Sequence, residues 1–183
     1  MRSVRSIQPL PGGIQNYPIT LAKMLGMCLE PVPVKLLRGH IFGTFPTVSS
    51  ERVAGGYISG VLYALGLAER SGRNVVATQS GRRFAETLDL AILEKALLTR
   101  VEGIPELLGV LGESDGRMAE IQAEMAAAGF DWLSDWQVRF RLRWLRVVGL
   151  TMRLTEKDSS GRYPEWTLTS RGRRELAGGG RAR

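Results

Sequence analysis

Cysteine and histidine are almost absent from this chain, which limits the chemistry that its sites can carry. Its 183 residues include one cysteine, Cys28, and one histidine, His40. A single cysteine forms no internal disulfide, and these two side chains are too few to build a zinc cluster. We therefore expect no metal site, and a reducing compartment such as the cytoplasm.

Long apolar runs are also missing. Charged residues interrupt every apolar stretch within about a dozen residues, which is shorter than a membrane-spanning helix requires. The first residues, which include Arg2 and Arg5, lack the apolar core of a secretory signal peptide. We expect a chain that neither spans nor crosses a membrane.

The motifs of common enzymes are missing as well. The chain has no Gly-x-x-x-x-Gly-Lys-Ser/Thr loop for nucleotide phosphates, and no strand precedes Gly55, Gly56 and Gly60 as a dinucleotide fingerprint requires. His40 has no serine or cysteine partner in a catalytic pattern. Four acidic residues near the middle of the chain lack the spacing of a calcium loop. They are Glu113, Asp115, Glu120 and Glu124. We expect a protein that is not an enzyme and needs no cofactor.

Positive charge is abundant and unevenly distributed. The chain carries a net charge of +7, and apolar residues make up 44% of it, enough for a packed core. Residues 1–85, 86–136 and 137–183 carry net charges of +7, −8 and +8. The basic blocks favour a polyanionic partner such as nucleic acid, and the acidic block is expected to face away from it.

One motif occurs twice. Each copy consists of the end of a helix, a Gly-Leu pair, two short segments around a polar turn, and the sequence Thr-x-x-Gly-Arg-Arg. Gly66 and Gly149 stand where a helix ends and a positive φ is needed. The segments around the turn predict a two-stranded hairpin that ends at Thr78 or Thr169, and it is about eight residues longer in the second copy. Short basic helices are then expected to begin at Ser80 and Ser170.

Apolar residues at helical spacing predict the helices that precede each hairpin. Ser50 and Ser134 are suitable N-caps for the two helices that lead into the Gly-Leu pairs. The expected helices cover residues 19–29, 34–42, 51–65, 88–101, 104–111, 117–128 and 135–148. Residues 1–13 and 177–183 show no periodicity, and we interpret them as a flexible basic arm and a flexible basic tail.

This combination of helices and hairpin resembles the winged-helix superfamily, whose hairpin, the wing, commonly reads Leu-Gly-Leu, hairpin, Leu-Thr-x-x-Gly. The resemblance implies a mainly α protein with small β-hairpin wings (α+β), in which residues 14–85 and 86–176 form two winged-helix units in tandem. Similar pairs occur in transcription regulators, in modules of restriction systems, and in the kleisin-binding subunits of bacterial chromosome-condensation complexes. The motif does not separate these families.

In winged-helix proteins the helix before the wing is the one that can enter the major groove. In the second unit Val138, Leu142 and Leu145 lie on one arc of that helix and are expected to face the core. Arginines flank this arc, and arginine suits both phosphate clamping and bidentate guanine contacts. The candidate DNA contacts are Gln137, Arg139, Arg141, Arg143, Arg146, Arg153, Arg162, Arg171, Arg173 and Arg174, with Arg70 and Arg73 of the first wing as secondary contacts.

Phe140, Trp144 and Val147 project from the same helix on the side opposite to the core arc. An apolar patch of this size generally marks an interface, so we expect the first unit or a second chain to cover it. The corresponding helix of the first unit, residues 51–65, has Arg52 as its one basic residue. We therefore assign the first unit mainly to packing or protein contact.

The expected function is double-stranded DNA binding by a cytoplasmic, nucleoid-associated protein. Such a protein would act as a transcription regulator, or as the DNA-recognition component of a larger assembly, with a homodimer as one possible form. The alternative is a winged-helix adaptor whose partner is a protein, as in chromosome-condensation complexes. In that case the basic surfaces would only assist the binding of that partner.

Overall fold

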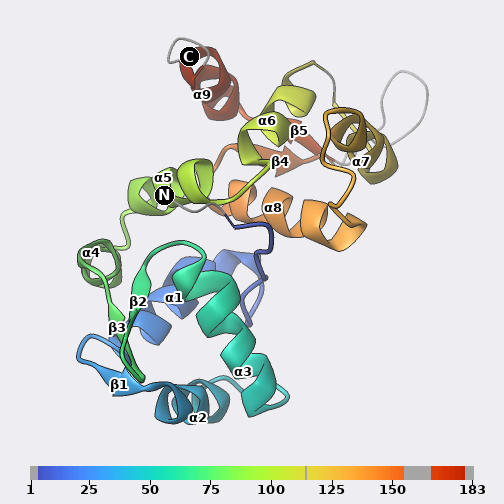
Figure 1. Ribbon diagram of the computed structural model, residues 1–183. Coiled ribbons are helices and arrows are strands. Elements are labelled where there is room, and N and C mark those ends of the chain that lie inside the picture. The colour runs from blue at the N-terminus through green and yellow to red at the C-terminus, as the bar shows by residue number, and fades with distance from the viewer. Residues whose placement is uncertain (1–3, 114, 155–165, 180–183) are drawn as a thin grey trace. The chain divides into compact units, whose positions relative to one another are not determined.

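The computed structural model describes residues 4–113, 115–154 and 166–179, and it is mainly helical with small antiparallel sheets of two and three strands (Figure 1). This confirms the expected α+β class. The chain divides into two compact units, Met1–Val101 and Glu102–Arg183. Within the described residues, no helix combines the length and apolar character needed to span a membrane.

The division between the units lies after Val101, so the expected boundary between residues 85 and 86 is wrong. Hydrogen bonds hold the helix over Leu90–Arg100 in the first unit. The Nε of Arg100 donates to the Ala64 carbonyl oxygen at 3.2 Å, and the Arg100 carbonyl accepts from the Val4 backbone N–H at 2.7 Å. The apolar pattern of this segment predicts a helix but does not show which of the two cores the helix joins.

The first unit contains five α-helices and a three-stranded sheet within its described residues. The sheet has the order β1-β3-β2 and is antiparallel, with Val32 opposite Val75 and Ala68 opposite Ala77. The strand β1 was not expected, because its sequence holds a proline and only two residues. The elements are α1 (Tyr17–Gly26), β1 (Val32–Pro33), α2 (Val34–Thr44), α3 (Glu51–Tyr57), the π-helical segment η2 (Ile58–Tyr63), β2 (Ala68–Ser71), β3 (Asn74–Ala77), α4 (Gln79–Thr87) and α5 (Leu90–Arg100).

The N-terminal segment of the first unit is packed against the fold, so the expected flexible arm is wrong for residues 4–11. The side chains of Ile7 and Leu10 are buried. The Gln8 backbone N–H donates to the carbonyl of Gly60 at 3.1 Å. A Cβ on Gly56 or Gly60 would lie 2.9 or 3.0 Å from the Gln8 side chain, so these glycines give room to this segment.

The second unit contains four α-helices and the two-stranded antiparallel sheet β4-β5 within its described residues. Thr151 lies opposite Leu168, and Arg153 lies opposite Trp166. Residues 155–165, which include the candidate contact Arg162, lie outside the described residues. The helix α9 continues to Gly179, so residues 177–179 of the expected tail are helical. The elements are α6 (Ile104–Glu113), α7 (Met118–Ala127), α8 (Asp135–Val147), β4 (Thr151–Arg153), β5 (Trp166–Leu168) and α9 (Ser170–Gly179).

Both Gly-Leu pairs end their helices in the same way, as the sequence predicts. Gly66 and Gly149 adopt positive φ angles of 66° and 74°. The following leucines, Leu67 and Leu150, donate their backbone N–H groups to carbonyls five residues earlier, at 3.0 and 2.9 Å. This is the Schellman arrangement, which satisfies carbonyls at the end of a helix.

Both Thr-x-x-Gly sequences connect the hairpin to the helix end through one threonine hydroxyl. In the first unit the Thr78 hydroxyl donates to the Gly66 carbonyl at 2.9 Å and accepts from the Gly81 N–H at 3.2 Å. In the second unit the Thr169 hydroxyl makes the equivalent bonds to Gly149 at 2.6 Å and Gly172 at 3.0 Å. The threonines are therefore the N-caps of α4 and α9. The helix α9 begins at Ser170 as expected, whereas α4 begins at Gln79, one residue before the expected Ser80.

Replacing the glycine of either Thr-x-x-Gly sequence by alanine should destabilise the unit that contains it by about 2 to 3 kcal/mol. An added Cβ on Gly81 would lie 1.9 Å from the carbonyl oxygen of Leu67, and one on Gly172 would lie 2.1 Å from that of Leu150. Urea titration measures both effects. Circular dichroism follows the whole chain, and fluorescence follows the second unit, which holds all four tryptophans.

Gly39→Ala in α2 and Gly109→Ala in α6 are matched controls, because a Cβ at either position meets no atom within 4 Å. Alanine has the higher helix propensity, so each control should be stabilised by about 0.5 to 1 kcal/mol. If Gly81→Ala and Gly172→Ala unfold at the same urea concentration as the wild type, the close approach of the glycine to the leucine carbonyl is not required for stability.

Candidate nucleic-acid interface

The helix α8 presents a basic arc between its apolar positions. Ser134 caps its first turn as expected and accepts from the Gln137 N–H at 3.4 Å. Val138, Leu142 and Leu145 are buried, which confirms the expected core arc. At 100° per residue, Arg139, Arg143 and Arg146 lie within roughly 60° of one another, on the flank between that arc and the side of Phe140 and Val147. Arg146 is exposed, and the other two are half-buried.

Arg141 belongs to the interior and not to the basic arc, so its assignment as a DNA contact is wrong. Its side chain is fully buried, and its Nε donates to the Glu102 carbonyl at 3.0 Å. One of its terminal nitrogens donates to the carbonyl of Gln137 at 3.0 Å and to the side-chain oxygen of Gln137 at 2.9 Å. The guanidinium carbon stands 5.6 Å from the ring centre of Trp132. Burial lowers the pKa of Arg141 to about 10, so the side chain stays charged at neutral pH.

Gln137 therefore has a structural partner, because its side-chain oxygen holds the Arg141 guanidinium. Four other candidate contacts of the second unit lie within the described residues. Arg153 on β4 and Arg174 on α9 are exposed. Arg171 donates to the Val148 carbonyl at 2.6 Å, and Arg173 donates to the Thr167 hydroxyl at 3.4 Å and lies 3.9 Å from the Asp115 carboxylate.

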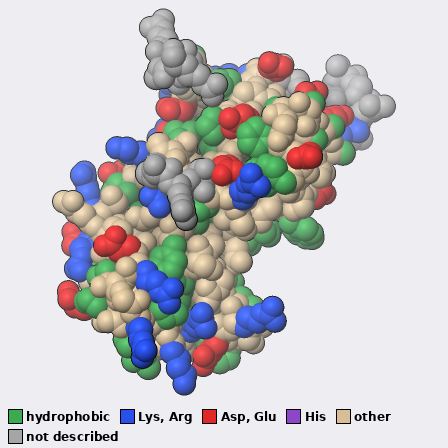
Figure 2. Space-filling model, viewed as in Figure 1, with side chains coloured by type: hydrophobic (Ala, Val, Ile, Leu, Met, Phe, Trp, Pro, Cys, Tyr) green, Lys and Arg blue, Asp and Glu red, His purple; other side chains and the backbone are tan. Residues whose placement is uncertain are grey.

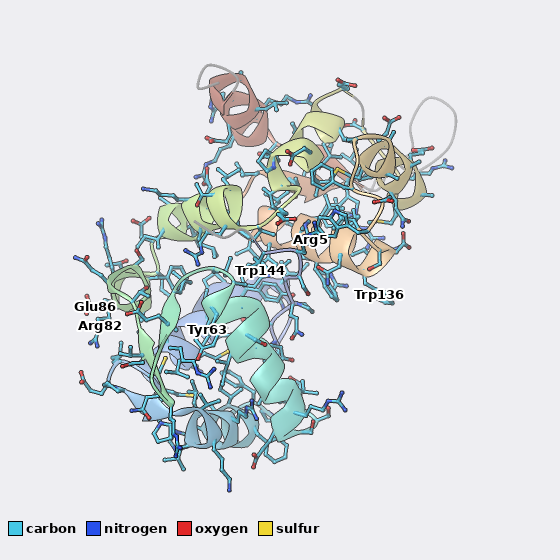
Figure 3. The ribbon with its side chains drawn as sticks, in the orientation of Figure 1. Arg5, Tyr63, Arg82, Glu86, Trp136 and Trp144 are labelled. Carbon is cyan, nitrogen blue, oxygen red and sulfur yellow. The ribbon has the colours of Figure 1, made fainter. Side chains whose placement is uncertain are left out.

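The apolar patch of α8 is covered unevenly. Trp144 is fully buried, whereas Phe140 and Val147 are half-buried. Trp136, which was not among the expected interface residues, is 64% exposed, and its ring centre lies 6.2 Å from that of Phe140 (Figure 3). The sequence contained a signal for this contact, because Trp136 precedes Phe140 by one helical turn.

The two basic residues of the first unit that were assigned as secondary contacts lie at its hairpin. Arg70 and Arg73 are exposed there, as their assignment as secondary contacts requires. Arg82 donates to the Leu29 carbonyl and lies 3.6 Å from Glu30, and Arg83 lies 3.9 Å from Asp89. In Figure 2, Lys and Arg side chains are spread over this unit, whereas acidic side chains gather over α6 and α7 of the second unit.

The chain's one thiol is held in a form that does not react. Cys28 is fully buried in the first unit, and its Sγ lies 3.7 Å from the Met24 carbonyl oxygen. Burial raises the pKa of the thiol to about 11, although the nearby Arg82 opposes the shift. Only a thiolate is an effective nucleophile, so this side chain is suited to packing. His40, on α2, is exposed. Among the described residues, no three His, Cys, Asp or Glu side chains are grouped as metal ligands.

In comparisons with known proteins, no protein-family model, no curated protein and no solved structure matches the chain. The role of the basic arc is therefore inferred from its own charge, burial and geometry.

Cys28 should resist alkylation by iodoacetamide in the native protein at pH 7.5 and react rapidly in urea, because burial both shields the thiol and raises its pKa. The raised pKa of Cys28 also predicts that stability depends on pH. Because the thiol ionises more readily in the unfolded state than in the folded state, the free energy of unfolding should fall as the pH rises above about 9. Cys28→Ala should remove that part of the alkaline loss. Native labelling as fast as that of free cysteine would contradict the burial.

Arg141→Met should lower the free energy of unfolding of the second unit by about 2 kcal/mol, because it leaves the Glu102 carbonyl without its donor. Arg146→Met is the matched control on the same helix, since Arg146 is exposed. Its effect should stay within about 0.5 kcal/mol. Tryptophan fluorescence in urea measures both, and equal effects would show that Arg141 has no structural role.

Proposed function

We propose that the chain is a tandem winged-helix protein that binds double-stranded DNA through its second unit. It would act as a regulator or as the DNA-recognition component of a larger assembly. The first unit has the helices α1 and α2, then α3 with η2, the hairpin β2-β3 and α4. The second unit has the same order, with α6 and α7, then α8, the hairpin β4-β5 and α9. The repeated threonine link between helix end and hairpin supports treating the two as copies of one unit.

The observation that carries the proposal is the position of the cations on α8. Arg139, Arg143 and Arg146 form one flank of the helix, between the core arc that contains the buried Leu142 and the opposite side that carries the buried Trp144. A major groove admits one helix, and arginine can reach both phosphates and the acceptors of guanine from such an arc. The exposed Arg153, at the end of β4, places a further cation on the neighbouring hairpin.

The present partner of Arg139 does not prevent this role. Its guanidinium lies 3.9 Å from the Asp135 carboxylate one turn earlier, and both side chains are more than a third exposed. Exposed ion pairs of this kind contribute little, roughly 0.3 to 0.5 kcal/mol, and are screened by salt. A phosphate group can therefore replace the carboxylate at small cost.

The acidic surface of α6 and α7 would set the direction of approach. Glu113, Asp115, Glu120 and Glu124 are exposed on or beside these helices. Their carboxylates would repel a phosphate backbone, so a duplex is favoured on the α8 side of the second unit.

The first unit has a smaller share in the proposed contact. Gln8 lies against Gly56 and Gly60, so the N-terminal segment occupies part of the surface of α3 and η2. Arg70 and Arg73 remain exposed at the hairpin. We assign them to phosphate contacts that add affinity without reading sequence.

The second candidate function is that of an adaptor for a protein partner, in a larger assembly or a homodimer. The pairing of the exposed Trp136 with the half-buried Phe140 favours it, because an accessible tryptophan is a frequent anchor in protein interfaces. This pair lies next to the basic arc on α8, so the two functions compete for neighbouring surfaces of one helix.

Replacing Arg139, Arg143 and Arg146 together by alanine should weaken binding to a labelled duplex of roughly 30 base pairs. By the counterion-release relation, the slope of log affinity against log salt should shrink by about 0.9 for each phosphate that is no longer neutralised. Fluorescence anisotropy between about 50 and 200 mM salt measures the slope. An arginine that reads a base would instead cost about 1 to 3 kcal/mol on the preferred sequence alone.

The matched control removes three exposed charges from the first unit, with Lys35, Arg52 and Arg70 changed to alanine. It should reduce affinity less than the α8 triple variant does. A larger loss in the control would move the DNA-reading role to the first unit. Absence of wild-type binding at the lower salt concentration would favour the adaptor.

A further inference from the structure

The first unit contains a cavity of about 590 Å³ between the end of the η2 helix, α4 and α5. Its apolar side includes Leu65, Leu67 and Ile92, and its rim carries Arg83, Lys95 and Arg100. The cavity volume lies within the range of about 300 to 1,000 Å³ that is typical of small-molecule sites. None of its lining residues belongs to the basic arc of α8.

The cations around this cavity exceed the acidic groups. Asp89 is the acidic residue in the lining, and it stands 3.9 Å from Arg83 in an exposed, weak pair. Lys95 is exposed on α5. Arg100 is fixed by its bond from Nε to the Ala64 carbonyl, and its guanidinium lies directly over Gly66. The cavity therefore combines a net positive rim with a fixed guanidinium.

The apolar side of the cavity favours an amphipathic small anion over a DNA backbone. Ala91 is exposed and Ile92 is half-buried, so the accessible part of the lining offers hydrocarbon contacts, whereas Leu65 and Leu67 are almost fully covered. A DNA backbone presents phosphate and sugar along an extended surface and does not fill such a cavity. An amphipathic small molecule satisfies both the rim and the interior.

We propose that this cavity binds a small organic anion. Its carboxylate or phosphate would contact Arg83, Lys95 and Arg100, and its hydrocarbon part would lie against Ala91 and Ile92. This site is separate from the proposed DNA contact, so it stands or fails independently of the DNA-binding function.

The test uses the full chain and the fluorescent probe 8-anilinonaphthalene-1-sulfonate, which joins a sulfonate to an aromatic body. Saturable binding to one site is expected. Lys95→Glu should weaken it about tenfold, because the change removes an attractive charge-assisted hydrogen bond and introduces a repulsive charge. Ala91→Trp, at an exposed position of the lining, should also weaken it by filling the cavity.

Lys23→Glu is the control, since Lys23 is exposed on α1 and the change in charge is the same. It should leave the probe affinity within about twofold of the wild type. Octanoate and octyl phosphate should each displace the probe, and the more effective of the two identifies the head group. Circular dichroism of each variant shows that it is folded.

Unchanged probe affinity in both Lys95→Glu and Ala91→Trp would overturn the site. Displacement by duplex DNA in the wild type that disappears in Lys95→Glu would also overturn it, because the cavity would then hold a DNA phosphate. Displacement by the two octyl compounds, with no effect of inorganic phosphate at the same concentration, would confirm that the apolar interior takes part.

Discussion

Each unit of this protein depends on one threonine hydroxyl that bridges two backbone groups. In the first unit Thr78 links the carbonyl at the end of one helix to the N–H at the start of the next, and Thr169 does the same in the second. The hairpin between these two points is short and would be only marginally stable by itself. The bridge fixes both of its ends to helices, and the glycine three residues later leaves room for the leucine carbonyl beneath it. The positions of the hairpin and of the helix before it follow from this one contact.

The sequence was sufficient to predict features that depend on neighbours along the chain. The positive φ angles at Gly66 and Gly149, the cap at Ser134 and the core arc of α8 are all of this kind. Features that depend on distant residues were missed. Helical periodicity places Arg141 on the flank of α8, and only Glu102 and Trp132, brought in from elsewhere in the chain, make it a buried residue.

The same limit explains the errors at the N-terminus. Residues 1–13 show no periodicity, and local patterns cannot indicate that Ile7 and Leu10 would be buried. Gly56 and Gly60 leave room for the Gln8 side chain, but glycines in a helical segment do not by themselves show which segment approaches. The sequence identifies the basic residues of the candidate site, but it does not show which residues surround each of them in the fold. Exposure separates Arg146 from Arg141, although both are arginines of one helix.

The pairing of Val4 with the end of α5 joins the beginning and the end of the first unit. Val4 forms a parallel bridge with Val101, across nearly the whole length of that unit. Closing a loop of roughly a hundred residues costs entropy that grows slowly with length, so the contact forms only when much of the unit is already in place. During synthesis, Val4 can therefore take its final place only after Val101 has emerged from the ribosome. The bond from Gln8 to Gly60 needs a much shorter stretch of chain, so the N-terminal segment would dock in two steps, with Gln8 first.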